Sequence, residues 1–385
     1  MGLQAGIVGL PNVGKSTLFN ALTSASVEVA NYPFATIEPN VGVVPVPDPR
    51  LDVIASIIPT QKVIPTTVEI LDIAGLVKGA SEGEGLGNQF LGHIRSVDAI
   101  LHVVRCFESE DITHVEGSVN PRRDIETIEL ELALADLAVA ERRLDRLERA
   151  ARTGDKEAEP ARDATHRLVA ALSEGAQARS VDWTDDERAL LADAQLITLK
   201  PVLYVCNVDE SGLAGNELTE VVAGIARQDG SGLVILCAEA EMQIAQLDET
   251  DRASFLQELG VAEPGLAVLA RATYALLGLD TFFTAGPKEV RAWTVRRGSK
   301  APKAAGVIHT DFEKGFIRAE IYAFPDLVEY GSEAALRAAG KLRVEGKDYV
   351  VADGDVVHFR FNVQSREPQS RVGWSRSASK QGPAS

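Results

Sequence analysis

The chain has 385 residues, of which 45% are hydrophobic and 25% charged, a composition typical of a soluble globular protein with two or three domains. Its formal net charge of −17 argues against a protein that coats nucleic acid with its whole surface. The N-terminus lacks a basic region followed by a long apolar stretch, and no apolar run reaches membrane-spanning length, so we expect a cytoplasmic protein without a membrane partner.

The three cysteines are interpreted as reduced core residues. Cys106, Cys206 and Cys237 lie far apart in the sequence, and each stands in an apolar run. Such spacing, with an odd number of cysteines, indicates neither a zinc site nor a disulfide framework.

The first motif is a glycine-rich loop between a predicted strand and a predicted helix. Residues 9–17 read GLPNVGKST and are followed by the apolar-periodic residues 18–22. In such a loop the glycines let backbone N–H groups turn toward phosphate oxygens, Lys15 supplies a cation for the outer phosphates, and the Ser16 hydroxyl can ligate Mg²⁺. The sequence therefore predicts a P-loop that binds a nucleoside triphosphate.

Two later segments carry the signals of a nucleotide switch. Thr36 lies in the proline-punctuated segment 31–40, where P-loop switch proteins place a second Mg²⁺ ligand. Asp72 ends a strand-like run and is followed three residues later by Gly75. We predict that Asp72 holds the Mg²⁺ water shell and that the Gly75 amide approaches the γ-phosphate. The glycine-rich loop 76–88 is expected to reorder with nucleotide state.

The residue after Gly75 is Leu76, where a Ras-like enzyme has the glutamine that orients the attacking water. An alkyl side chain cannot hydrogen-bond that water, so hydrolysis must use another group or be slow until a partner completes the site. His114 is our candidate, because it follows the buried strand 99–104 on the ligand-binding side of a doubly wound sheet. An ordinary surface histidine is the alternative.

A second buried strand, residues 202–206, leads into the segment expected to meet the base. Guanine-specific relatives carry Asn-Lys-x-Asp there, whereas this chain has Asn207, Val208, Asp209 and Glu210. Glu210 is one methylene longer than the usual Asp, and Val208 replaces the lysine that covers the base, so guanine selection is weakened. Asn207 can still bond to N6 and N7 of adenine. We predict that ATP is accepted at least as well as GTP.

Residues 124–199 are predicted to form an antiparallel helical arm inserted into the nucleotide domain. Leucines recur every seven residues, which indicates a short coiled-coil seam. These leucines are Leu130, Leu137 and Leu144, and Ala133, Ala140 and Leu147 follow them at an offset of three residues. The polar stretch 153–160 is interpreted as the hairpin tip, and Thr184 with Glu187 as a capping box for a later helix. Ordinary bundle helices packed on the sheet are the alternative.

From residue 279 the composition indicates a small α+β module. Residues 289–295 alternate like a strand, residues 333–339 are helix-like, and residues 348–361 are predicted to form two strands around an Asp-Gly turn. The tail 364–385 lacks apolar periodicity and is expected to be disordered.

The charge of the chain is segregated. From Lys288 to Arg318 there are eight basic and three acidic residues, a local charge of +5 in a chain that is acidic overall. RNA therefore stays an open alternative as the partner of this segment.

Taken together, these motifs resemble the Obg-like ATPase family, the YchF branch of translation-factor-class P-loop proteins, over almost the whole chain. The resemblance is carried by residues 9–17, 72–80, Asn207 with Glu210, and 284–316. It implies hydrolysis of ATP and GTP, a C-terminal TGS module and association with ribosomes.

The resemblance also implies roles for individual residues. Nucleotide contacts are implied for Asn12, Val13, Gly14, Lys15, Ser16, Thr17 and the backbone at Val208, and Mg²⁺ contacts for Ser16 and Thr36. Leu76 matches the apolar residue that the family carries at the glutamine position. Potassium-activated relatives hold a monovalent cation with an Asn at the position of Asn12, so K⁺ is a further expected cofactor.

The sequence thus predicts an α/β protein with a doubly wound P-loop NTPase domain (1–123 and 200–278), the helical arm (124–199) and a C-terminal α+β TGS domain (279–363). The predicted catalytic residues are Lys15, Gly75 and His114; the predicted nucleotide contacts are Asn12 to Thr17, Asn207, Val208 and Glu210; and the predicted Mg²⁺ ligands are Ser16, Thr36 and Asp72. We expect a monomeric, slow ATP/GTP switch whose arm and TGS domain engage the ribosome or RNA. A non-hydrolytic nucleotide-sensing module and a P-loop kinase are the alternatives.

Overall fold

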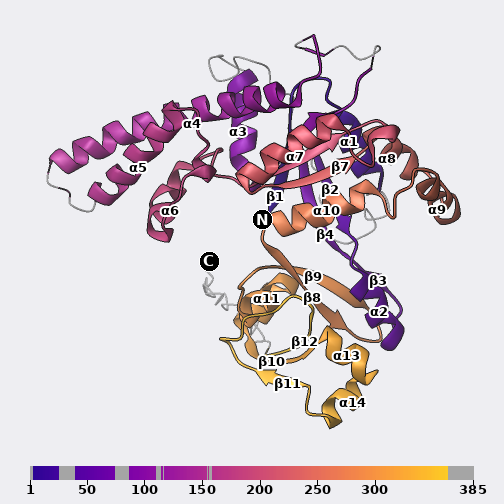
Figure 1. Ribbon diagram of the computed structural model, residues 1–385. Coiled ribbons are helices and arrows are strands. Elements are labelled where there is room, and N and C mark those ends of the chain that lie inside the picture. The colour runs from indigo at the N-terminus through magenta and orange to yellow at the C-terminus, as the bar shows by residue number, and fades with distance from the viewer. Residues whose placement is uncertain are drawn as a thin grey trace, which may run out of the picture.

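The structure is a computed structural model that describes residues 3–25, 40–73, 86–109, 114–115, 117–153, 155 and 158–362. Two six-stranded sheets lie one above the other in Figure 1, and a pair of long helices extends to one side of the upper sheet. Within these described segments no helix is long and apolar enough to cross a membrane. The predicted tail 364–385, Thr36, Gly75 and Leu76 all lie outside the described residues.

The upper sheet has the strand order β2-β4-β1-β5-β6-β7. All neighbours are parallel except β2 and β4, which are antiparallel. Its strands are β1 (Gln4–Val8), β2 (Val41–Val46), β4 (Thr66–Asp72), β5 (Ala99–Arg105), β6 (Val202–Asn207) and β7 (Gly232–Leu236). Every residue of β5 and β6 is buried, as expected for central strands covered on both faces. The prediction of an α/β sheet of this kind is confirmed.

Helices from distant parts of the chain share one hydrophobic core with this sheet. They are α1 (Lys15–Ala25), α3 (Leu86–Ser96), α4 (Pro121–Arg152), α7 (Glu217–Asp229), α8 (Ala238–Ile244), α9 (Glu249–Glu258) and α10 (Gly265–Leu276). Cys106, Cys206 and Cys237 are free and buried, as predicted. Because the strands run parallel, their carboxyl ends meet along one edge, and the loops at that edge are the ones that can form a shared site.

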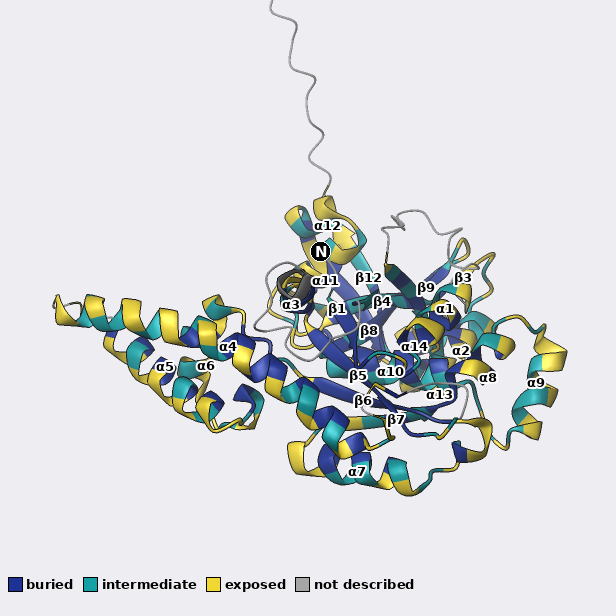
Figure 2. Ribbon diagram, turned by 90° about the horizontal axis from the view of Figure 1, so that it is seen from above, coloured by how far each residue is buried: buried dark blue, intermediate teal, exposed yellow. Residues whose placement is uncertain are grey.

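The helical arm consists of the distal part of α4, together with α5 (Ala158–Ser173) and α6 (Asp185–Leu191), and Figure 2 shows it projecting from the body. Helix α4 begins three residues before the predicted boundary, because the Asn120 side chain accepts a hydrogen bond from Arg123 N and Pro121 occupies the first turn. The capping box of Thr184 and Glu187 at the start of α6 is confirmed. Two short 3₁₀ turns flank α6, Ala178–Ser180 before it and Ala192–Ala194 after it.

The predicted leucine seam is only partly correct. Leu137 packs against the buried cluster between α4 and α5, but Leu130 is 52% exposed. The buried α4 positions in that cluster are Ala133 and Ala140, seven residues apart. Both alanines belong to the predicted seam, and such small residues allow two helices to approach closely, whereas Leu130 lies outside the seam.

The lower sheet has the strand order β11-β10-β12-β8-β9-β3. Its strands are β3 (Val63–Ile64), β8 (Leu279–Ala285), β9 (Val290–Arg296), β10 (Phe316–Ala323), β11 (Arg343–Glu345) and β12 (Asp355–Phe361). The neighbouring residues Phe282 and Phe283 point to opposite faces and belong to two separate hydrophobic clusters. Helices α11 (Ala301–Ile308), α12 (Thr310–Lys314), α13 (Phe324–Tyr330) and α14 (Glu333–Ala338) complete the module.

Two details of this module differ from the sequence prediction. Only the second of the two strands predicted in residues 348–361 forms, as β12, whereas Val350 makes an isolated bridge to Lys300. The backbone before the turn is bonded elsewhere, since Ala301 N donates to Tyr349 O and Val351 N donates to Ser299 O. The segment containing α2 (Pro49–Ile57) and β3, expected in the nucleotide domain, belongs to the lower sheet because β3 pairs with β9.

Candidate nucleotide-binding site

The loop between β1 and α1 has the backbone geometry of an anion cradle. Asn12 and Gly14 have φ values of 62° and 96°, in the left-handed region. A Cβ at Gly14 would lie 2.1 Å from Asn207 Nδ2, and a Cβ at Gly9 would lie 2.5 Å from Val103 O. Only glycine fits these two positions, so the glycines of the motif are explained by close approach as well as by backbone conformation.

Lys15 is the first residue of α1 and is buried, with 7% of its surface exposed. Its Nζ donates to Leu10 O at 2.7 Å across the loop. Burial lowers the pKa of Lys15 to about 8, although the nearby Asp72 carboxylate acts in the opposite direction. The protein thus holds an ammonium group in a poorly solvated place, which a bound polyphosphate would stabilise in its charged form.

Two of the predicted Mg²⁺ ligands, Ser16 and Asp72, lie near this lysine. Ser16 and Thr17 are exposed in the first turn of α1, and Asp72 ends β4. Burial raises the pKa of Asp72 and Lys15 partly offsets that shift. Hydroxyl and carboxylate oxygens suit Mg²⁺, which keeps several waters and takes one or two protein ligands beside the phosphates. The described residues contain no cluster of three or more His, Cys, Asp or Glu that could hold a metal ion.

A cavity of about 670 Å³ opens beside the P-loop at the carboxyl edge of the upper sheet. It is lined by residues from four segments, which follow β1, β5, β6 and β7: Asn12, Gly14, Thr17, Phe107, Asn207, Val208, Asp209, Glu210, Ser211, Cys237, Ala238, Glu239 and Gln243. Seven of these are additional to the predicted contacts. The phosphate loop and the predicted base-side strand end therefore share one cavity of a size suited to a small ligand.

Phe107 is the cavity residue that the sequence reasoning missed most clearly. It lies two residues beyond the end of β5, and the Arg105 side chain fixes its backbone. Arg105 Nε donates to Phe107 O at 3.1 Å, and the guanidinium lies 4.6 Å from the ring centroid. Arg105 is itself only 1% exposed. The position of Phe107 after a buried strand was the available signal, because loops at this edge line the site.

Asn207 connects the two halves of the site. Its Nδ2 donates to Val13 O at 3.0 Å, and its Oδ1 accepts from Ala238 N at 3.0 Å. The side chain is 5% exposed. The nitrogen and the oxygen of the side-chain amide thus each bond to a backbone group, which connects the P-loop to the turn between β7 and α8. The contact of Asn207 with the base stays a prediction. The second hydrogen of Nδ2 and the second lone pair of Oδ1 would make that contact.

The neighbouring predicted contacts are placed as follows. Val208 N donates to Leu236 O at 3.0 Å, so its carbonyl is the backbone group left to meet a nucleotide. Glu210 is exposed and begins the 3₁₀ turn Glu210–Gly212 at the cavity wall. Asp209 stabilises this turn by accepting from Gly212 N at 2.9 Å.

His114 is not among the residues that line the cavity. It is buried, and its Nε2 is 2.9 Å from Asp124 Oδ2 in the first turn of α4. Asp124 also forms an ion pair with Arg123, whose Nη2 lies 3.0 Å from the Oδ1 of Asp124. These contacts favour an anchoring role at the start of α4, and the role of His114 in catalysis stays a hypothesis. Thr36 and Gly75 cannot be placed, because they lie outside the described residues.

Comparison with known proteins matches both parts of the chain. A family model described as "50S ribosome-binding GTPase" matches residues 4–136, and the model YchF-GTPase_C, described as "Protein of unknown function (DUF933)", matches residues 279–362. The "Ribosome-binding ATPase YchF" of Pasteurella multocida is 56% identical over 363 residues, covering 94% of this chain and 100% of the relative. That of Bacillus subtilis is 53% identical over 366 residues, with the same coverage of both chains.

The similarity extends to eukaryotes and to a solved structure. "Obg-like ATPase 1" of Gallus gallus is 45% identical over 368 residues, covering 94% of this chain and 93% of the relative. The structure of the Schizosaccharomyces pombe YchF GTPase is 38% identical, with a TM-score of 0.85 over 93% of this chain and 98% of that chain. A common fold and a common sequence along nearly the whole length of the relatives lead to one conclusion: this chain belongs to the YchF/Obg-like ATPase family.

Proposed function

We propose that the protein is a ribosome-associated switch that binds and slowly hydrolyses ATP and GTP with Mg²⁺. The observation that carries this proposal is the cavity of about 670 Å³, which joins the P-loop to the strand ends beside it. The names of the relatives, ribosome-binding and Obg-like ATPases, support the same function. Ribosome association is in turn consistent with the cytoplasmic location expected from the sequence.

In this proposal Lys15 and the amides of the P-loop bind the phosphates. Ser16, Thr36 and Asp72 would hold Mg²⁺, which neutralises charge on the outer phosphates when bound. Asn12, Val13, Gly14 and Thr17 complete the phosphate side. The placement of Ser16 and Asp72 near Lys15 supports these roles, while Thr36 and Gly75 rest on their sequence positions alone.

The base side is formed by Asn207, Val208 and Glu210. No lysine stem covers the base and the acidic residue is Glu210, so ATP is accepted at least as well as GTP. A titration with fluorescent ADP and GDP tests this preference. A tenfold or greater preference for GDP, about 1.4 kcal/mol, would contradict it.

Water activation is the incomplete part of the site. Leu76 offers no hydrogen bond to the attacking water, so turnover without a partner is slow. The Asn12 side chain would help to hold K⁺ near the phosphates, which predicts faster hydrolysis in potassium than in sodium buffer. Equal rates in the two buffers would remove K⁺ from the proposal.

We assign ribosome or RNA binding to the arm and the lower sheet, the TGS-like module, of a monomeric protein. The basic segment is less positive in the fold than in the sequence, because four of its residues form ion pairs, three of them with acids outside the segment. The pairs are Arg297 with Asp280, Lys300 with Asp348, Lys303 with Glu313, and Arg318 with Glu320. Binding through this module therefore relies on shape as well as charge.

Ribosome co-sedimentation with ATP, GTP and ADP, with phosphate release followed in the same samples, tests the function. We expect the bound fraction to depend on the nucleotide, phosphate release to rise with ribosomes, and both effects to disappear in Lys15→Met. Nucleotide-dependent binding without phosphate release would favour the non-hydrolytic module. Release that requires a phosphate acceptor would favour a kinase.

A further inference from the structure

The connection between β2 and β4 departs from the upper sheet and becomes part of the lower one. These two strands are the antiparallel pair at the edge of the upper sheet, paired from Val41 with Leu71 to Val46 with Thr66. At the far end of the hairpin, α2 and β3 lie among the elements of the lower sheet in Figure 1. The hairpin therefore reaches from one sheet into the other.

The tip of the hairpin is built into the lower sheet by packing and by backbone pairing. Leu51 and Ile54 of α2 are buried in one of its two hydrophobic clusters, together with Phe283 and Val290. Strand β3 pairs in parallel with β9, and Val290 N donates to Lys62 O at 2.9 Å. Removing the tip would therefore open the core of the lower sheet.

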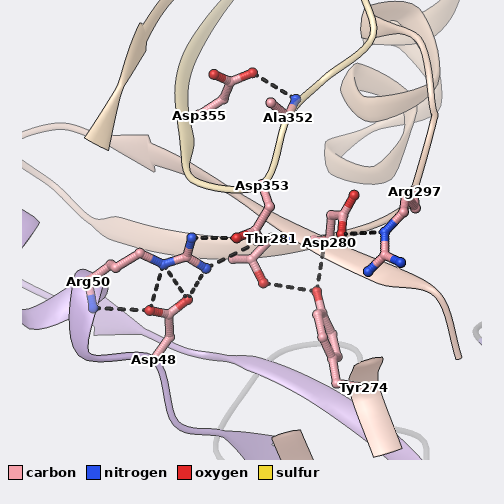
Figure 3. A network of polar contacts seen from close by, with 9 residues as sticks. All are labelled: Asp48, Arg50, Tyr274, Asp280, Thr281, Arg297, Ala352, Asp353 and Asp355. Carbon is pink, nitrogen blue, oxygen red and sulfur yellow. Dashed lines mark hydrogen bonds and ion pairs between the residues drawn. The ribbon is translucent and has the colours of Figure 1, made fainter. Parts of the chain in front are cut away.

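An ion pair fastens the start of α2 to the same sheet, as Figure 3 shows. Arg50 Nη1 lies 2.6 Å from Asp353 Oδ2, and the guanidinium lies 5.3 Å from the ring centroid of Phe283. Asp353 in turn accepts from Thr281 N at 2.9 Å. Gly354, beside this pair, has a φ of 88°, in the left-handed region that favours glycine, and a Cβ there would lie 3.0 Å from Arg50 Nη1.

The base of the hairpin lies at the nucleotide site. Asp72, the last residue of β4, is close enough to Lys15 for each to shift the pKa of the other, and Asp72 N donates to Asn40 O at 3.0 Å, beside the start of β2. The first residue of β4, Thr66, shares a hydrogen bond with Thr294 of β9. At about 3.3 Å per residue, β4 thus spans roughly 20 Å from Thr66, at the lower sheet, to the carboxylate of Asp72 at the predicted nucleotide site.

We propose that this β2–β4 hairpin couples the nucleotide site to the lower sheet, and that the Arg50–Asp353 pair is its positioning contact. A shift of Asp72 when ATP replaces ADP would move β4 as a unit, because strands within a sheet are held by their hydrogen bonds. The tip, which consists of α2 and β3, cannot follow without moving β9, because β3 pairs with β9 and α2 is buried in the same cluster. The inference rests on the proposed nucleotide function, and it makes the lower sheet the reporter of nucleotide state.

Hydrogen exchange of the full-length protein tests the coupling, in the presence of Mg²⁺ with ADP or with a non-hydrolysable ATP analogue. In the wild type we expect exchange in peptides covering α2 and β8 to differ between the two nucleotides by about fivefold or more, the lower limit of typical allosteric coupling. In Arg50→Met the difference should fall below about twofold, with nucleotide affinity retained.

A second variant leaves every side chain in place. Gly-Gly insertions after Pro47 and after Pro65 lengthen both connections between the sheets, so they should abolish the difference as Arg50→Met does. Arg360→Met is the matched control, because it removes a different ion pair of the lower sheet, with Glu320 at 2.9 Å, that does not touch the hairpin. It should keep the wild-type difference.

Three outcomes would overturn the inference. In the first, hydrogen exchange of the lower sheet in the wild type is identical with ADP and with the ATP analogue. In the second, the exchange difference between the two nucleotides survives in both Arg50→Met and the Gly-Gly insertion variant. In the third, both variants lose protection throughout the protein without nucleotide, which would make the segment purely structural. Nucleotide affinity is measured in the same samples. Failure to bind either nucleotide would instead refute the proposed function.

Discussion

Replacing Asn207 tests whether the P-loop is held by the neighbouring strand end. Asn207→Ala removes both amide contacts and leaves Val13 O and Ala238 N without their present partner in a buried place. An unpaired buried backbone group costs about 1–3 kcal/mol. Because water from the adjacent cavity can recover part of this, we expect the free energy of unfolding to fall by about 2–4 kcal/mol.

The same substitution should weaken nucleotide binding in a way that identifies the role of the amide. If Asn207 acts by positioning the P-loop, the affinities for ATP, GTP and UTP should fall by a similar factor, about 10- to 100-fold, or 1.4–2.7 kcal/mol. If it acts mainly through the base, the loss should be confined to the purine nucleotides. Asn207→Asp should be worse than Ala, because it places a carboxylate oxygen against Val13 O.

Urea unfolding and fluorescent-nucleotide titration measure the two effects. Asp209→Asn is the matched control, since Asp209 lines the same cavity and caps the next turn but does not bond to Val13 or Ala238. An unfolding free energy for Asn207→Ala within about 0.5 kcal/mol of the wild type would refute the structural tie. A loss of affinity restricted to purines would refute the positioning role.

Three other substitutions follow from buried polar groups. Burial lowers the pKa of Lys15 to about 8 from the ordinary 10.5, so between these pH values the unfolded chain binds more protons than the folded protein. Urea titrations of the nucleotide-free protein should therefore show stability rising with pH across this window, by up to about 3 kcal/mol, and Lys15→Met should lack the rise. ATP affinity should fall above about pH 8, as Lys15 loses its proton. His114→Ala should cost about 1–3 kcal/mol of stability by leaving Asp124 short of a buried partner, while single-turnover hydrolysis with and without ribosomes stays within about twofold. Glu241→Ala should cost a similar amount, because its carboxylate accepts from the first two N–H groups of α10, whereas the exposed Glu239→Ala should be near neutral in thermal unfolding.

Opposite results have clear meanings for these three sites. A pH profile of stability that is unchanged in Lys15→Met would contradict the burial argument for that lysine. A large loss of single-turnover rate in His114→Ala, with stability preserved, would support the catalytic role of that residue. Equal stability of the two glutamate variants would remove the cap from α10.

The sequence by itself determined the phosphate side of the site. Spacing of glycine, lysine and serine is a local property, and Asp72 at the end of a strand follows from a short apolar run. The same is true of the Thr184 capping box and of the long helix pair, which depend on neighbours three to seven residues away. Interactions within one turn or one strand can be predicted because the chain itself brings those groups together.

Only the tertiary structure decided what joins distant segments. Asn207 reaches Val13 across 194 residues, and Arg50 reaches Asp353 across 303. His114 contacts Asp124 in the first turn of α4, and residues 49–64 leave the upper sheet for the lower one. Such contacts depend on which strands become neighbours and which faces are buried together, and periodicity along the chain carries no record of either. The residues predicted to bind phosphate and Mg²⁺ could therefore be named from the sequence, whereas the contacts that hold and connect the loops around the cavity appeared only in the folded molecule.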